Sequence, residues 1–312
     1  MKVTYGIGKV KKPFKKSILA IGVFDGLHRG HQELVLRAVK KARSLKLRAM
    51  VMTFFPHPVQ VLHPTIKIPL IVSLNHRLKL IEALGVHDCV VINFTKKFSR
   101  LTPEEFVKDY LFQGLQPKEI FVGDDFRFGR DRRGSLDCFE ELGKKYGFKV
   151  NAVHPVKGKT GQNKISSTTI REFITQGKLA AAQQLLNRPV SLMGKVVRGD
   201  GRGRSLGFPT ANIFALGQAL PPCGVYAVRV TVEKKIFLGM ANIGHKPSFQ
   251  KVNPQLNIEV HIFTFNKNLY GKEIVVEFIK KMREEQIFSS ENELIAQLEK
   301  DQLQAKKILA VN

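Results

Sequence analysis

In the first half of the chain, short apolar runs alternate with segments whose apolar residues recur at helical spacing. Compact apolar runs bounded by turn-forming or polar residues predict buried strands, and they cover residues 17–21, 47–55, 89–94, 119–123 and 148–153. Helices are predicted over residues 33–40, 72–84 and 135–146, and a further helix begins at Thr102-Pro103. This alternation predicts an α/β fold with a doubly wound, mostly parallel sheet.

From about residue 188 onward, the pattern changes to short β-branched runs separated by turn residues. These runs predict strands over residues 190–197, 224–232, 236–243, 256–265 and 272–279. Such a series is typical of a small all-β barrel, closed or partly closed. Ser290 and Glu293 fit a capping box, which predicts a C-terminal helix. We therefore predict two domains, residues 1–187 and residues 188–312.

The chain of 312 residues is strongly basic, with 51 Lys and Arg, 26 Asp and Glu, and a formal net charge of +25. The first 187 residues hold 33 of the basic and 15 of the acidic residues. Much of the charge is dispersed in pairs without aromatic residues between them, which favours a solvated surface over a nucleic-acid face. The same field would attract a small anionic ligand, so charge alone does not identify the partner.

Three cysteines, Cys89, Cys138 and Cys223, stand far apart and form no CxxC motif. Neither a disulfide framework nor a zinc site is indicated, so we expect a reducing, cytoplasmic location. No apolar run approaches the roughly 18 residues of a spanning helix, and the first residues lack the apolar core of a signal peptide. We expect no membrane association, and the sequence leaves the oligomeric state open.

The stretch from Gly22 to His31 lies between the first predicted strand of this series and its helix. Glycines let the backbone approach a ligand closely, and a helix start leaves N–H donors unpaired, so such a turn can bind an anion. A Gly-rich turn alone is a weak signal, because many are merely tight connections. Two imidazoles, His28 and His31, flanking Gly30 make the binding interpretation far more specific.

A second candidate for phosphate binding is Ser166-Ser167-Thr168-Thr169-Ile170-Arg171, directly before a helical stretch. A hydroxyl here would cap the helix, and that purely structural interpretation is as good as the functional one on the hydroxyls alone. The arginine favours function, because hydroxyls, free N–H groups and a guanidinium together suit a polyphosphate.

A third motif lies in the predicted barrel, where a loop with four glycines and two arginines runs from Gly199 to Thr210-Ala211-Asn212. Such a loop can wrap a polyphosphate, and Thr210 and Asn212 alternate on a strand, so both could face one Mg²⁺. The alternative is a plain surface loop. Glu259 is a charge in an otherwise strand-like sequence, so it either faces solvent or serves chemistry.

The chain resembles the bifunctional bacterial riboflavin kinase/FAD synthetase family along essentially its whole length. In the first domain, His28-Arg29-Gly30-His31 matches the HxGH element of nucleotidyltransferases, and Ser166 to Arg171 matches their Ser-Ser-Thr-x-x-Arg element. The flavin-specific branch is matched by residues 22–26 and 122–129. The second domain resembles flavokinases at residues 207–212, 224–226, 242–244, 269–272 and 283–288.

The resemblance implies two successive reactions with small-molecule substrates and no nucleic-acid partner. The barrel would phosphorylate riboflavin to FMN with ATP, with Glu259 as general base and with Thr210 and Asn212 holding Mg²⁺ and phosphates. The first domain would adenylylate FMN to FAD and release pyrophosphate, with His28, His31 and Arg171 stabilising the phosphate charge. Residues expected to bind ATP or flavin are Gly22, Phe24, Asp25, Gly30, Pro56, Asp125, Phe126, Phe128, Ser167, Thr168, Gly203, Arg204, Gly207, Pro209, Thr210 and Asn212.

Two departures from the family pattern keep a second hypothesis open. Thr264 to Asn268 replaces a more acidic pattern, and Lys246-Pro247-Ser248-Phe249 stands where the family shows Arg-Pro-Thr-Phe. An enzyme with only the adenylyltransferase active would fit these departures. A third hypothesis, a nucleic-acid-binding protein on an α/β scaffold, rests on the net charge.

Overall fold

The computed structural model describes residues 1–7, 16–154, 165–199, 201–215, 217–245 and 256–310. The departure at Lys246 to Phe249 lies outside these residues. Two compact units are present: Met1–Ile68 with Leu74–Ser167, and Pro69–Ser73 with Thr168–Asn312. The first compact unit thus ends at Ser167, well before residue 187. The boundary predicted after residue 187 separates the two functional domains, and it stays a prediction.

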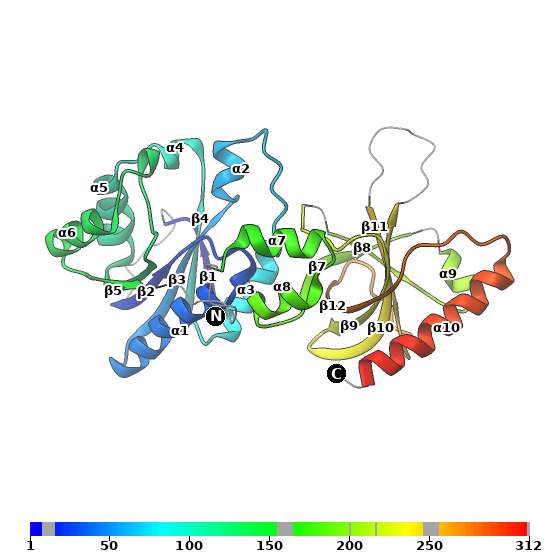
Figure 1. The fold of residues 1–312 in the computed structure, drawn as a ribbon. Coiled ribbons are helices and arrows are strands. Elements are labelled where there is room, and N and C mark those ends of the chain that lie inside the picture. The colour runs from blue at the N-terminus through cyan, green and yellow to red at the C-terminus, as the bar shows by residue number, and fades with distance from the viewer. Residues whose placement is uncertain (8–15, 155–164, 200, 216, 246–255, 311–312) are drawn as a thin grey trace. The chain divides into compact units, whose positions relative to one another are not determined.

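Strands and helices alternate through the first unit (Figure 1). Its elements are β1 (Lys2–Tyr5), β2 (Ser17–Ile21), η1 (Asp25–Leu27), α1 (Arg29–Ser44), β3 (Arg48–Phe55), α2 (Pro58–Leu62), α3 (Leu74–Ala83), β4 (Asp88–Asn93), α4 (Lys96–Ser99), α5 (Pro103–Glu105), η2 (Phe106–Leu115), β5 (Pro117–Gly123), η3 (Arg130–Arg132), α6 (Leu136–Tyr146) and β6 (Lys149–Val153).

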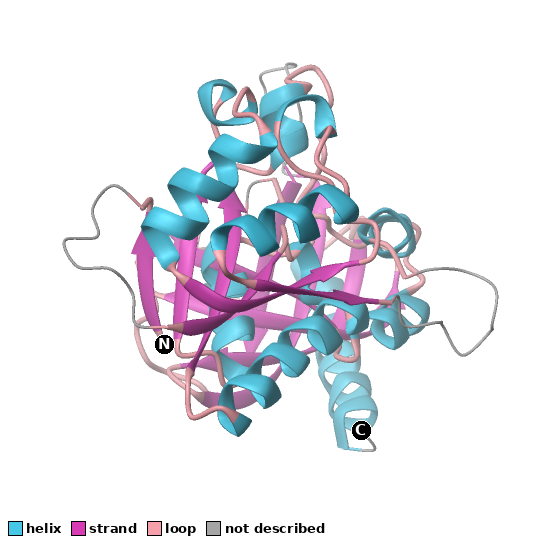
Figure 2. Cartoon of the chain, turned by 90° about the vertical axis from the view of Figure 1, so that its left-hand side faces the viewer, coloured by secondary structure: helices cyan, strands magenta, loops and turns pink. Residues whose placement is uncertain are grey.

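The six strands form one parallel sheet in the order β1-β4-β3-β2-β5-β6. Alternate residues of β2 enter two different cores: Ile18 and Ala20 pack with α1 and α3, whereas Leu19 and Ile21 pack with η2 and α6. Side chains of a strand alternate between the two faces, so the sheet is covered by helices on both (Figure 2). The predicted doubly wound sheet is confirmed.

The second unit contains a closed barrel followed by a long helix. Its elements are α7 (Ser167–Thr175), α8 (Leu179–Leu186), β7 (Val190–Val197), α9 (Arg202–Ser205), β8 (Ala211–Phe214), β9 (Gly224–Val232), β10 (Lys235–His245), β11 (Leu256–Ile262), β12 (Glu273–Arg283) and α10 (Glu291–Ala310). The strand order is β10-β11-β8-β7-β12-β9, and β9 pairs with β10 to close the barrel. Ala305 and Leu309 of α10 are buried together with Ala227 and Met240 of the barrel.

Several details differ from the sequence predictions. The edge strand β1 was missed, because half-exposed residues give no compact apolar run. Thr210 lies just before β8 rather than on it, so only Asn212 is a strand residue. At α10, Ser290 Oγ accepts from the N–H of Glu293 as predicted, but the Glu293 carboxylate accepts from the N–H and hydroxyl of Ser289 instead of closing a capping box.

Candidate active sites

The turn from Gly22 to His31 follows β2, at the point where the strand order of the sheet reverses. β2 is flanked by β3 on one side and by β5 on the other. After β2 the chain adds β3 and β4 on one side, and it later adds β5 and β6 on the other side. Ligands of open α/β sheets bind at such a switch point, beyond the carboxyl ends of the strands. Phe24 and Leu27 have left-handed backbone, with φ of 54° and 42°. Backbone conformations of this kind are unfavourable for non-glycine residues, and they are found most often at functional sites.

His28 and His31 form one stacked unit at the start of α1. His28 is the N-cap of the helix, and its Nδ1 accepts from the backbone N–H of His31 at 3.3 Å. The two rings stack with centroids 3.6 Å apart. Gly30 lies close beside them, because an added Cβ would come within 3.3 Å of the His28 ring, a tight contact.

Both imidazoles are neutral near pH 7. Burial lowers the pKa of His28 to about 4, against opposing effects of the Asp25 and Asp125 charges. Burial also lowers the pKa of His31 well below its usual value, helped by the neighbouring His28 and by Arg77. Because Nδ1 of His28 is an acceptor, its proton lies on Nε2. His28 is thus a neutral N–H donor at the N-terminus of a 16-residue helix.

The structure brings part of the second phosphate motif to this turn. Ser167 Oγ donates to the carbonyl of Asp25 at 3.1 Å, although the two residues are 142 positions apart. Thr168 and Arg171 follow on α7 and belong to the second unit. Arg171 Nε donates to the carbonyl of Pro69 at 2.8 Å.

The residues predicted to contact flavin in the first unit differ in exposure. Pro56 follows a cis Phe55–Pro56 peptide at the end of β3. Asp125 is exposed after β5, whereas Phe128 is buried and its ring lies 4.8 Å from that of Phe139. Phe126 stacks on Phe128 with centroids 5.4 Å apart. Phe128 therefore packs in the core, and Phe126 lies between that core and the surface.

A cavity of about 410 Å³ opens in the barrel and is lined by β8, β10, β11, the glycine-rich loop and the segment after β12. Among its lining residues are Gly203, Thr210, Asn212 and Glu259. The cavity is the concave, partly apolar kind of site that binds small molecules. The structure thus gathers these four of the seven predicted barrel residues around one space, whereas Arg204, Gly207 and Pro209 do not line it.

Three polar side chains form a row across adjacent strands of this cavity. Glu259 of β11 lies directly opposite Asn212 of β8 on one side and Asn242 of β10 on the other. Directly opposed residues project to the same face of a sheet. Glu259 Oε1 also accepts from Asn257 Nδ2 at 2.8 Å. Glu259 therefore faces a polar cavity and not an apolar core.

The remaining residues of the glycine-rich motif have separate positions. An added Cβ at Gly203 would collide with the carbonyl oxygen of Phe208, and Gly207 has a φ of 82°, so both positions need glycine. The carbonyl of Pro209 lies 2.8 Å from His261 Nδ1. Arg204 is exposed and does not line the cavity.

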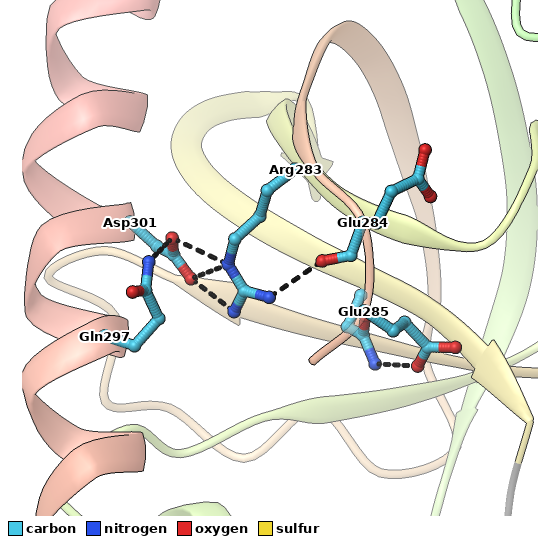
Figure 3. Close-up of polar contacts among 6 residues, drawn as sticks. Arg283, Glu284, Glu285, Gln297 and Asp301 are labelled. Atoms are coloured by element: carbon cyan, nitrogen blue, oxygen red, sulfur yellow. Dashed lines mark hydrogen bonds and ion pairs between the residues drawn. The ribbon is translucent and has the colours of Figure 1, made fainter. Parts of the chain in front are cut away.

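An ion pair anchors the segment after β12 to α10 (Figure 3). Nε and Nη2 of Arg283 donate to the carboxylate of Asp301, which is fully buried, at 2.7 to 3.0 Å. Gln297 donates to the same carboxylate at 2.9 Å. Next in the chain, Glu285 accepts from Asn242 at 3.3 Å at the cavity wall. The family motif at 283–288 thus serves to hold one wall of the cavity.

Sequence reasoning missed Asn242, Arg283 and Asp301 as individual site residues, and it missed Arg77 entirely. Arg77 is three residues after Leu74 and four before Ile81, so it lies on the apolar stripe of α3. A basic residue on the apolar face of a predicted helix can be found from the sequence alone, and it indicates a buried charge. No spacing rule connects Arg283 to Asp301, which come from different elements.

Comparisons with known proteins agree with the resemblance. A family model described as FAD synthetase matches residues 10–169, and one described as riboflavin kinase matches residues 186–309. Curated proteins named bifunctional riboflavin kinase/FMN adenylyltransferase include one from Buchnera aphidicola subsp. Schizaphis graminum, which is 39% identical over 96% of each chain. Another, from Escherichia coli K12, is 38% identical over 100% of this chain and 99% of its own.

A crystal structure described as a macrolide-efflux protein from Streptococcus pneumoniae has the same fold. It matches 98% of this chain and 99% of its own with a TM-score of 0.82 and 32% identity. In the part of the chain that the structure describes, no helix has the length and apolar character to cross a membrane. Family models over both halves and full-length relatives agree, so the chain belongs to the family of bifunctional riboflavin kinases/FMN adenylyltransferases, which make FMN and FAD.

Proposed function

We propose that the barrel cavity is the riboflavin kinase site and that Glu259 is its general base. The ribityl 5′-hydroxyl oxygen attacks the γ-phosphorus of ATP, its proton passes to Glu259, and ADP leaves as the bond to the β-phosphate oxygen breaks. The observation that carries this assignment is the row of Asn212, Glu259 and Asn242 facing one cavity. A carboxylate placed between two amides on adjacent strands is well suited to orient and deprotonate a hydroxyl.

Thr210 and Asn212 are the residues that would hold Mg²⁺ with the ATP phosphates. Their hydroxyl and amide oxygens are ligands of the type Mg²⁺ prefers, and it commonly keeps water and substrate phosphates in its remaining positions. Among the described residues, no group of three or more His, Cys, Asp or Glu could hold a metal ion.

The turn from Gly22 to His31 is the adenylyltransferase site in our proposal. A phosphate oxygen of FMN attacks the α-phosphorus of ATP, and pyrophosphate leaves as the bond to the β-phosphate breaks. Backbone donors of the turn and the Nε2–H of His28 stabilise the charge on the phosphates. His31, Ser167, Thr168 and Arg171 complete the set, with Pro56, Asp125, Phe126 and Phe128 assigned to the flavin side.

A product time course tests both assignments in one chain. From riboflavin, ATP and Mg²⁺, the protein should form FMN and then FAD. We expect His31→Ala to accumulate FMN, and Glu259→Ala to use FMN while its rate with riboflavin falls at least about 100-fold. His63→Ala and Glu273→Ala, both at exposed positions, serve as matched controls. Riboflavin turnover that survives Glu259→Ala would remove Glu259 as the base, and no FMN from riboflavin in the unaltered protein would leave only the adenylyltransferase active.

We propose further that the protein works in the cytoplasm without a nucleic-acid partner. Cys89, Cys138 and Cys223 are free thiols, which suits a reducing compartment. Burial raises the pKa of Cys89 to about 12, so its thiol is unreactive. The functional boundary after residue 187 belongs to the same proposal and is supported by the riboflavin kinase match that begins at residue 186.

A further inference from the structure

Arg77 of α3 is a fully buried cation beneath the turn from Gly22 to His31. It is 0% exposed and ranks first by size among the fully buried side chains. Burial lowers its pKa, and the charge of Asp25 opposes that effect. A buried guanidinium is costly unless its contacts repay the loss of water, so its position needs a reason.

The contacts of Arg77 join the turn after β2 to the last residues of β3. Its Nη1 donates to the carbonyls of Val23 at 2.9 Å and Phe54 at 3.2 Å, with Thr53 Oγ1 at 3.4 Å. Thr53 also donates to the Val23 carbonyl, at 2.8 Å. One side chain therefore fixes the Gly22 turn against the segment that leads to Pro56.

The hydrogen bonds to the Val23 carbonyl fix the orientation of the N–H of Phe24, which belongs to the same peptide group. In a trans peptide the carbonyl and the following N–H point in opposite directions, so the N–H of Phe24 points away from Arg77. Within the described residues, this N–H has no hydrogen-bond partner. Phe24 has a φ of 54°, which costs a non-glycine residue about 1–2 kcal/mol unless contacts hold it. Arg77 supplies such a contact.

Arg77 also leaves donor capacity and charge at the site. Its Nε and Nη2 are buried and have no partner in the described part of the chain. No described carboxylate lies within ion-pair distance of it. The positive charge is therefore not neutralised by a direct contact, and it helps to keep His31 neutral.

We propose that Arg77 is a positioning residue for adenylyl transfer, which orients the Phe24 N–H toward the nucleotide phosphates and adds fixed positive charge beneath them. The proposal rests on the assignment of the Gly22–His31 turn as the ATP site. Arg77 acts through the Val23 carbonyl and makes no contact with substrate. Fixed donors and charges of this kind need no reorganisation during the reaction, so they favour the transition state.

The test compares Arg77→Met, Arg77→Lys and Leu78→Ala in the full chain, with FMN and ATP as substrates. Leu78 is a buried neighbour on α3 and controls for lost packing. For Arg77→Met we expect kcat/KM for ATP to fall about 100-fold beyond the Leu78→Ala effect. The loss should lie mainly in kcat, because displacement of reacting groups slows the chemical step. Riboflavin phosphorylation by the same protein should stay unchanged.

The pH profile separates positioning from mere stability. Arg77→Met removes a charge that lowers the pKa of His31, so the acid limb of FAD formation should move to higher pH. Arg77→Lys keeps the charge and should restore the limb but not the full rate. Thr53→Val, which removes the second donor to the Val23 carbonyl, should lower kcat about 10-fold, within the range that one neutral hydrogen bond accounts for. It replaces Arg77→Met if that variant does not fold.

Either of two results would overturn the proposal: an Arg77→Met rate within a factor of about 3 of Leu78→Ala, well below the loss that misplacement causes, or an equal fall of both activities. A parallel His31→Ala assay isolates the underlying assignment. If His31→Ala still makes FAD, the site itself is misplaced. If His31→Ala is inactive while Arg77→Met is not, only the role of Arg77 fails.

Discussion

Two glycines of this chain lie too close to a neighbouring side chain to carry a Cβ. An added Cβ at Gly22 would lie 2.9 Å from the Phe24 ring, and one at Gly199 would collide with the amide of Asn212. Neither glycine has a positive φ, so close approach, rather than backbone freedom, is the reason for glycine.

Gly199→Ala should impair the kinase alone. The methyl group must displace the side chain of Asn212, which faces the cavity beside Glu259. We expect the kcat for riboflavin phosphorylation to fall about 10- to 100-fold, because a displacement of a binding group by about 1 Å can cost a factor of this size. FAD formation from FMN is the internal control and should keep its rate. Equal activity of the variant with riboflavin would show that Asn212 is not needed there.

His28 makes the stability of the first unit depend on pH. Its pKa is about 4 in the folded protein and 6.5 in the unfolded chain, so between these values only the unfolded chain takes up the proton. Above pH 6.5 neither state binds this proton, so the folded state keeps its full free energy of unfolding. As the pH falls toward 4, His28 alone lowers that free energy of unfolding by about 3 kcal/mol.

The variant His28→Gln isolates this contribution. The stability difference between wild type and variant should shrink from pH 7.5 to 4, measured by urea unfolding with hydrogen exchange of peptides from β2 and β3. His63→Gln, at an exposed position, is the control. Parallel curves for wild type and His28→Gln would contradict the lowered pKa.

At the scale of elements, α10 supports the proposed kinase cavity through a buried ion pair in addition to its apolar packing. Asp301 is fully buried and the Arg283 side chain is 16% exposed, so the pair is largely shielded from water. Arg283 also lies 5.8 Å from the ring of Phe288, which lines the cavity. The helix, the segment after β12 and the cavity wall are therefore coupled.

Asp301→Ala should destabilise the second unit by about 3–5 kcal/mol, because it leaves the Arg283 charge without its partner. The KM for riboflavin should rise as the segment 284–288 loses its anchor. Removing both charges with Arg283→Met and Asp301→Leu should recover much of the melting temperature, measured by scanning calorimetry. A double variant no more stable than Asp301→Ala would show that the ion pair is not the anchor.

For the whole molecule, the net charge of +25 creates an electrostatic field that attracts anions. A basic surface raises the local concentration of anionic substrates, and salt screens this attraction over about 8 Å at 0.15 M ionic strength. We expect kcat/KM for ATP to fall several-fold from 50 to 300 mM KCl in both reactions, with kcat unchanged.

An RNA-binding measurement separates the flavin enzyme from the nucleic-acid hypothesis. A labelled single-stranded RNA should bind weakly at 0.15 M KCl and should be displaced by added salt. Tight RNA binding that ATP and FMN do not reduce would support a nucleic-acid partner. Fluorescence anisotropy with a fixed RNA concentration gives both the affinity and its salt dependence.

Most elements of the fold could be predicted because each carries a local pattern. β2, β3 and β5 are buried on both faces, so they read as continuous apolar runs, and the barrel strands are separated by turn residues. Half-exposed β1 and the short helices α2 and α4 carried no such pattern, since α2 and α4 bury no residue. In α8 the buried Leu179, Ala182 and Leu186 do follow helical spacing, but we predicted no helix there.

The candidate sites divide in the same way. The sequence identified the Gly22–His31 turn and the Thr210–Asn212 pair, since in each the chemistry lies within a few residues. It could not reveal that Arg77 reaches Val23 and Phe54, or that Arg283 meets Asp301, because these contacts join elements distant along the chain.

By itself, the sequence determined the two-part α/β and barrel architecture, and it pointed to the family and to three candidate phosphate-binding motifs. The architecture is encoded in the short-range spacing of apolar and turn-forming residues, whereas the family rests on the resemblance of its motifs. Only the tertiary structure decided that Glu259 stands between Asn212 and Asn242, that both histidines are neutral, and that a buried arginine lies beneath the turn. Register, burial and charge environment arise from packing, because they depend on which distant residues exclude water from a group.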